Sequence, residues 1–197
     1  MKKNFFIIIF LIFAFTQKSF GYSSDPKQFI TEIVNEAKEI LIETNTKKFK
    51  EAKLSEIALR TVDIKGVAYY SLGNYRKQLT DEQLKEYLAL FEKYFLKSFT
   101  SRLTDYSDPK IDVLSTEVIN AKYTIVKSIL LATDKKPEVK IEWRIYTKNP
   151  DKPLIRDLII EGLSLARTQK EEFASVIETN NGDISKLFIT LKEFTAK

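Results

Sequence analysis

Residues 138–146 read EVKIEWRIY, and this stretch decides the fold class because charged residues alternate with apolar ones. Side chains of a β-strand point alternately to its two faces, so the pattern predicts a strand with one buried face. The apolar members of the stretch are Val139, Ile141, Trp143 and Ile145. The centre of the chain is therefore expected to be sheet.

Three neighbouring stretches extend this sheet, at residues 110–119, 121–132 and 154–163. The stretch 121–132 is apolar at both odd and even positions, which predicts a central strand covered on both faces. The connections between the four stretches are only a few residues long. Short connections favour antiparallel neighbours, so the sequence predicts a four-stranded antiparallel meander.

Before and after these strands, apolar residues recur every three or four positions, which is the spacing of an α-helix with one buried face. A long helix with an aromatic stripe is expected to begin after a capping box formed by Thr80 and Gln83 and to stop before Pro109. The other expected helices cover residues 26–43, 46–58, 63–72 and 166–180, and a last one follows Asp183. Helices, then strands, then helices predict an α+β domain, with helices packed on one curved four-stranded antiparallel sheet.

The composition excludes many kinds of enzyme. The 197 residues include no Cys and no His. There is therefore no thiolate nucleophile, no disulfide, no imidazole base and no thiolate or imidazole metal ligand. Asp105 and Asp108 near a helix end are interpreted as a capped terminus and not as a metal site. We expect a binding protein with no catalytic residues, no metal and no cofactor.

Residues 1–21 have the layout of a secretory signal peptide. Lys2 and Lys3 precede an apolar run from Phe5 to Phe15, and cleavage is expected after Gly21. An uncleaved membrane anchor is the alternative, although eleven residues at about 1.5 Å each span only half of a bilayer core. Without these residues and their three lysines the net charge is +2 instead of +5. So small a charge does not favour nucleic acid as a partner.

Several short motifs resemble one known family when they are taken in order. They are Asp63-Ile64, Leu72-Gly73, Thr80 with Gln83, Tyr106, the run from Asp157 to Leu165 (DLIIEGLSL), Lys170 and Phe173. Their order and spacing resemble the Mla-pathway periplasmic phospholipid-binding proteins, also called the toluene-tolerance or ABC-transporter auxiliary family. The resemblance covers residues 25–195, within an expected domain of residues 22–197.

The resemblance implies a periplasmic carrier that holds a phospholipid as cargo in an apolar cavity between sheet and helices. The implied partners are an inner-membrane MCE-type ABC transporter complex and an outer-membrane lipoprotein–porin complex, and the implied role is to maintain outer-membrane lipid asymmetry. The residues expected to line the cavity are Phe91, Phe95, Phe99, Ile125, Ile129, Trp143, Ile145, Leu158 and Ile160. The 14 Phe and 9 Tyr of the chain suit such a cavity.

Two other classes of protein fit the same residues. The first is a small cone-shaped enzyme of the NTF2-like kind, using an acid such as Asp157 together with Tyr123 or Tyr146. The second is an envelope interaction module with an ordinary filled core. Lipid extracted from the purified protein would separate the carrier from both.

Overall fold

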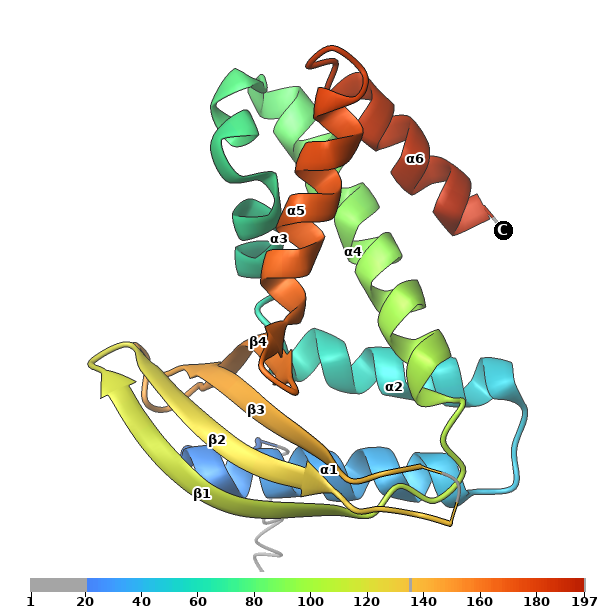
Figure 1. Cartoon of the computed structure of the whole chain (residues 1–197), viewed down its shortest axis with the longest axis vertical. Helices are drawn as coiled ribbons and strands as arrows, with labels where there is room; N and C mark the ends of the chain where they lie inside the picture. The colour runs from blue at the N-terminus through green and yellow to red at the C-terminus, as the bar shows by residue number, and fades with distance from the viewer. Residues whose placement is uncertain (1–20, 135, 197) are drawn as a thin grey trace, which may run out of the picture.

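The computed structural model describes residues 21–134 and 136–196, and within these it contains six α-helices and one five-stranded sheet. Figure 1 shows the sheet in the lower half with α1 along it, and α3, α4, α5 and α6 standing above. The expected α+β architecture is confirmed. The expected signal peptide lies, apart from Gly21, outside the described residues.

Side-chain caps fix the starts of the N-terminal helices. The helices are α1 (Pro26–Ile42), α2 (Lys47–Thr61), α3 (Ile64–Leu72), a 3₁₀ turn (Gly73–Gln78) and α4 (Asp81–Leu103). Asp25 accepts a hydrogen bond from the backbone of Gln28, and the expected capping box of Thr80 and Gln83 is present. These residues satisfy backbone N–H groups that the first helical turn cannot pair. Helices α5 (Leu165–Glu178) and α6 (Ser185–Ala196) follow the sheet.

The sheet is an antiparallel meander with strand order β1-β2-β3-β4-β5. Its strands are β1 (Ile111–Asn120), β2 (Tyr123–Leu130), β3 (Val139–Tyr146), β4 (Leu154–Ile160) and β5 (Leu163–Ser164). The sequence predicts four strands, but the structure has five in this sheet, because the stretch expected as one strand at residues 154–163 is divided between β4 and β5. Glu161 and Gly162 both have positive φ, 49° and 82°, which forms a two-residue turn and lets the chain pair back on β4.

Two separate hydrophobic cores hold the fold together. The sheet core lies between α1, α2 and one face of the sheet, and includes the buried residues Phe29, Ile30, Leu54, Val126 and Ile145. The helical core lies among α3, α4, α5 and α6, and includes the buried residues Ala68, Leu72, Tyr87, Phe91, Phe173, Ile177 and Leu187. The other face of the sheet therefore belongs to neither core.

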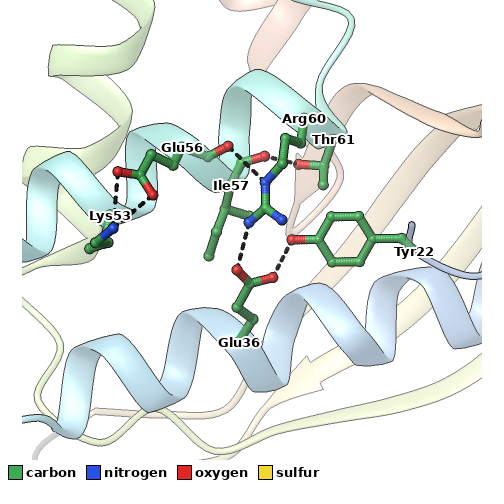
Figure 2. Close-up of polar contacts among 7 residues, drawn as sticks. All are labelled: Tyr22, Glu36, Lys53, Glu56, Ile57, Arg60 and Thr61. Atoms are coloured by element: carbon green, nitrogen blue, oxygen red, sulfur yellow. Dashed lines mark hydrogen bonds and ion pairs between the residues drawn. The ribbon is translucent and has the colours of Figure 1, made fainter. Parts of the chain in front are cut away.

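A polar cluster joins the N-terminal segment to the corner between α1 and α2 (Figure 2). Glu36 accepts hydrogen bonds from the Arg60 guanidinium at 2.6 Å and from the Tyr22 hydroxyl. The Arg60 guanidinium also lies 5.3 Å from the centre of the Tyr22 ring. Burial and the bond to Glu36 raise the pKa of the Tyr22 hydroxyl. The hydroxyl therefore stays protonated as a donor and holds the chain against α1.

The start of α3 combines a cap with a steric requirement. Asp63 accepts the backbone N–H of Gly66 at 2.9 Å. A Cβ atom on Gly66 would lie 2.4 Å from Oδ2 of the same carboxylate. Only a glycine at this position leaves room for the cap.

We predict that Gly66→Ala destabilises the protein by about 1–2 kcal/mol, because the new methyl group displaces the Asp63 carboxylate from its cap. In an ordinary helix interior the same change stabilises by up to about 1 kcal/mol. Denaturant unfolding of the single variants and of the Asp63→Ala/Gly66→Ala pair measures the coupling. Without the carboxylate, Gly66→Ala should become neutral or stabilising. A stabilising effect in the wild-type background would contradict this explanation.

Candidate functional site

A cavity of about 580 Å³ lies between α3, the start of α5 and one face of the sheet. The β2 residues Tyr123, Ile125 and Lys127 line it. They alternate along the strand with Val126, which belongs to the core beneath α1. Because neighbouring side chains point to opposite faces, the cavity lies on the sheet face away from α1.

The floor of the cavity is apolar. Val67 of α3, Ile125 of β2, Ile159 of β4 and Ala166 of α5 line it and are buried. Two larger residues on the lining are more accessible, since Tyr70 is 47% and Ile119 is 51% exposed. A buried apolar floor beside accessible apolar side chains suits a ligand with a hydrophobic part.

Asp157 attaches α5 to the sheet beside the cavity. Its side chain is buried, with the residue 6% exposed, and accepts hydrogen bonds from Ser164 Oγ at 2.6 Å and from the backbone N–H of Ala166 at 2.9 Å. Arg144 donates to the same carboxylate at 3.3 Å. Ser164 in turn caps α5 by accepting the N–H of Arg167. The carboxylate therefore satisfies the N-terminus of a helix and is itself compensated by a cation.

The next residue towards the N-terminus, Arg156, attaches α3 in the same way. Its guanidinium donates to Asp63 at 2.6 Å and to the Tyr123 hydroxyl at 2.8 Å, and it lies 3.6 Å from the centre of the Tyr146 ring. Burial alone would lower the pKa of Arg156, but the hydrogen bonds to Tyr123 and Asp63 outweigh it and raise that pKa. Two consecutive residues of β4 thus set the positions of both helix starts that border the cavity.

The remaining charges on the cavity wall form a row across three strands. Lys127 donates to Glu117 at 2.8 Å, and the sheet register places Glu142 opposite Lys127 on the other side. The hydrogen bond to Glu117 raises the pKa of the Lys127 ammonium, which stays charged. The wall next to the apolar floor is therefore polar and carries both signs of charge.

Among the nine residues expected to line a cavity, Ile125 lies on the wall of this one. Ile129 is on the same face of β2 but lies beyond the cavity lining. Phe91, Phe95 and Phe99 form a stacked ladder along α4, with ring centres 6.2 and 5.7 Å apart. Phe91 belongs to the helical core, and Phe95 packs against that core.

The other four lie on the sheet face towards α1. Trp143 and Ile145 are buried in the sheet core, and the Trp143 indole donates to Ser128 Oγ at 2.8 Å. Leu158 packs against the same core, and Ile160 shares its face by alternation. The nine residues are thus divided among the cavity face, α4 and the opposite face of the sheet.

Sequence reasoning did not identify most of the cavity wall. The residues missed include Val67, Tyr70, Ile119, Lys127, Glu142, Arg144, Arg156, Ile159 and Ala166. One signal was available for part of this set. In EVKIEWRIY, Glu142 and Arg144 alternate with Trp143, so they had to face away from the buried side of the strand.

The described residues, 21–134 and 136–196, contain no group of three acidic side chains placed to hold a metal ion. The same residues contain no helix that is both long and apolar enough to cross a membrane. The site consists of a cavity with an apolar floor and a charged wall.

Two comparisons place this architecture among known proteins. The fold is similar to that of the phospholipid-binding protein from Ralstonia solanacearum, whose structure holds a phospholipid. The TM-score is 0.71 at 20% sequence identity, over 85% of this chain and 94% of that one. A model of the MlaC protein family matches residues 27–193, and the chain therefore belongs to the MlaC protein family.

Proposed function

We propose that this protein is a phospholipid carrier and that the cavity on the open face of the sheet receives an acyl chain of the cargo. The observation that carries the proposal is the cavity itself, with buried Val67, Ile125, Ile159 and Ala166 as its floor. Membership of the MlaC family and the phospholipid held by the Ralstonia solanacearum protein support it.

The dimensions of the cavity suit part of a lipid. A bilayer core of about 30 Å corresponds to roughly 15 Å for each lipid tail. The strand from Tyr123 to Lys127 extends along the wall for about 13 Å. The volume of about 580 Å³ also falls in the range of small-molecule sites. Ile125 is the proposed contact for a tail, and Ile129 continues the same face of β2.

A carrier solves a free-energy problem for the cargo. Burial of a methylene group stabilises by about 0.8 kcal/mol, so a lipid with about thirty methylenes loses up to about 24 kcal/mol on entering water. Unaided crossing between membranes is therefore very slow. A protein that covers the tails removes most of this barrier without any chemical step.

The cellular role is proposed from the sequence resemblance. Residues 1–21 act as a signal peptide that directs the chain to the periplasm. The carrier then moves phospholipid between an outer-membrane lipoprotein–porin complex and an inner-membrane MCE-type ABC transporter. The five Gly of the chain are at positions 21, 66, 73, 162 and 182, so they do not form a Gly-rich loop that could bind a nucleotide phosphate. The free energy that drives transport in one direction therefore comes from the transporter.

Ile125→Trp should fill the cavity and lower the bound phospholipid at least fivefold, at a cost in stability of about 1–3 kcal/mol because the ring is larger than the buried side chain it replaces. Val126→Ala is the matched control, because its side chain lies on the opposite face of the same strand in the sheet core. We expect it to cost about 1–3 kcal/mol and to leave the lipid bound per folded molecule unchanged. Lipid extraction with mass spectrometry, beside unfolding curves, measures both. Wild-type protein without phospholipid, or equal lipid in the two variants, would contradict the proposal.

Processing can be checked directly on protein recovered from the cell envelope. We expect N-terminal sequencing to give Tyr22 as the first residue, because Gly21 ends the signal-peptide pattern. Material that begins at Met1 and stays in the membrane fraction would instead establish the membrane anchor.

Delivery should depend on partner complexes. A net charge of +2 without the signal peptide gives weak attraction to an anionic surface, where each basic residue contributes about 1 kcal/mol. We expect slow transfer of labelled phospholipid between plain vesicles and a large acceleration when the two complexes are reconstituted. Fast transfer that the complexes do not change would mean that the protein works without docking.

A further inference from the structure

The segment from Ile64 to Gln78, which forms α3 and the 3₁₀ turn, carries three cations and no acid. Helix α5 lies beside α3 (Figure 1) and adds two more cations. All five side chains belong to exposed residues, and we call them, together with Tyr69 and Tyr70, the cationic face. Its cations are Lys65, Arg76, Lys77, Arg167 and Lys170.

None of these five cations has a carboxylate partner among residues 21–134 and 136–196, where every ion pair uses another cation. The acid that precedes α3, Asp63, is bonded to Arg156. Glu178 of α5 accepts the hydroxyl of Tyr75 instead. The positive charge of the cationic face is therefore available to an acidic partner.

The charge is also local. Counted with the three acids of α5, the segments Ile64–Gln78 and Leu165–Glu178 together have a net charge of +2. The whole chain without residues 1–21 has the same net charge of +2. The excess positive charge of the protein is thus concentrated on these two segments, which is the distribution that steers an acidic partner to one side of a molecule.

The two tyrosines hold three of the cations in place. The Lys65 ammonium and the Arg76 guanidinium lie 5.7 and 5.3 Å from the centre of the Tyr69 ring. The Lys170 ammonium lies 5.5 Å from the centre of the Tyr70 ring. The face of an aromatic ring attracts a cation and restricts its position. Ordered side chains lose less conformational entropy when a partner binds them.

Lys170 also joins α5 to the end of α3. A Cβ atom on Gly73 would lie 2.9 Å from Cε of Lys170, and Gly73 has a positive φ of 54°. The absent side chain leaves room for the lysine to cross the backbone there. Gly73 and Lys170 belong to the motifs quoted from the sequence, and they meet on the cationic face.

The composition of the cationic face favours a protein partner over a bilayer. A membrane-surface helix needs apolar side chains that enter the lipid. Among the large hydrophobic residues that are exposed in the described parts of the chain, Tyr70 is the one on this face. Tyrosine and arginine are enriched at interfaces between proteins.

The cationic face adjoins the cavity. Gly66, Val67 and Tyr70 of α3 line the cavity, and Tyr70 belongs to both surfaces. A partner bound to the cationic face would therefore lie next to the site proposed for the acyl chain. We propose that this face docks on an acidic surface of a membrane complex that exchanges phospholipid with the carrier. The proposal rests on the carrier function and names the surface that meets the partner.

The test reverses two charges of the face with Arg76→Glu/Lys77→Glu. Binding is measured by surface plasmon resonance to the inner-membrane transporter complex and to the outer-membrane lipoprotein–porin complex, each held in nanodiscs of zwitterionic lipid. We expect the Kd for at least one complex to rise by at least about tenfold, because like charges then oppose each other across the interface. Lipid extraction should show that the variant keeps its phospholipid, since neither residue lines the cavity.

Lys48→Glu/Lys93→Glu is the matched control. Both lysines are exposed, have no ion pair in the described residues and lie on α2 and α4, outside the cationic face. This control lowers the net charge by as much as the test variant does. It should leave both Kd values unchanged within about twofold, because salt screens charges far from the interface.

The wild type supplies a second measurement that needs no variant. Raising the ionic strength from about 0.01 to 0.15 M shortens the screening length from about 30 to 8 Å and should weaken its binding. Binding that does not respond to salt, or that occurs with neither complex, would overturn the docking proposal. Equal losses in the two double variants would also overturn it.

Two further outcomes separate this proposal from the others. Binding of the wild type to empty phosphatidylglycerol nanodiscs as tight as its binding to the complexes would overturn a protein partner in favour of an anionic membrane. Wild-type protein that carries no phospholipid would overturn the carrier function. A loss of binding confined to Arg76→Glu/Lys77→Glu would still establish the cationic face as the docking surface in that case.

Discussion

The cavity depends on two consecutive residues of β4. Asp157 holds the N-terminus of α5 through Ser164 and Ala166, and Arg156 holds the N-terminal cap of α3 through Asp63. Each contact joins the sheet to a helix that borders the cavity. A partly buried charge needs a partner, so these positions cannot drift without leaving a charge unpaired. The pairing of β3 with β4 has a bulge that leaves Arg156 without a partner in the register, and this irregularity lets Arg156 and Asp157 reach towards two different helices.

The division into two cores explains how the protein can keep an open space. The helical core closes around Tyr87 and Phe173, and the sheet core closes around Phe29 and Val126. Each core buries its own apolar surface, so folding does not require the cavity to be filled. A domain with a single core would collapse onto such a space, because unfilled volume costs packing energy. The proposed cargo then occupies the space between the helices α3 and α5 and the open face of the sheet.

The sequence predicted the order and class of the elements because local rules decide them. The alternation of apolar and polar residues predicted the strands, and apolar residues at helical spacing predicted the helices. The expected capping box of Thr80 and Gln83 is present in the structure. The split of the last strand was missed, since the turn depends on positive φ at Glu161 as well as at Gly162. The residues expected to contact the cargo stay a prediction, and Ile125 is the one among them that lines the cavity described above. Apolar residues such as Trp143 were expected to line the cavity, but the structure places Trp143 in the sheet core. Alternation identifies two faces without showing which one a second layer covers, and that choice depends on long-range packing.

Among the motif residues that resemble the family, Asp63, Asp157 and Ser164 hold the starts of the two helices that border the proposed site. The most direct test of the central claim is photocrosslinking with a phospholipid that carries a diazirine near the end of one acyl chain. The carrier account predicts crosslinked peptides from α3, from β2 around Ile125 and from β4 around Ile159. Crosslinks confined to α4 around Phe95, or to the α1 face around Trp143, would contradict it.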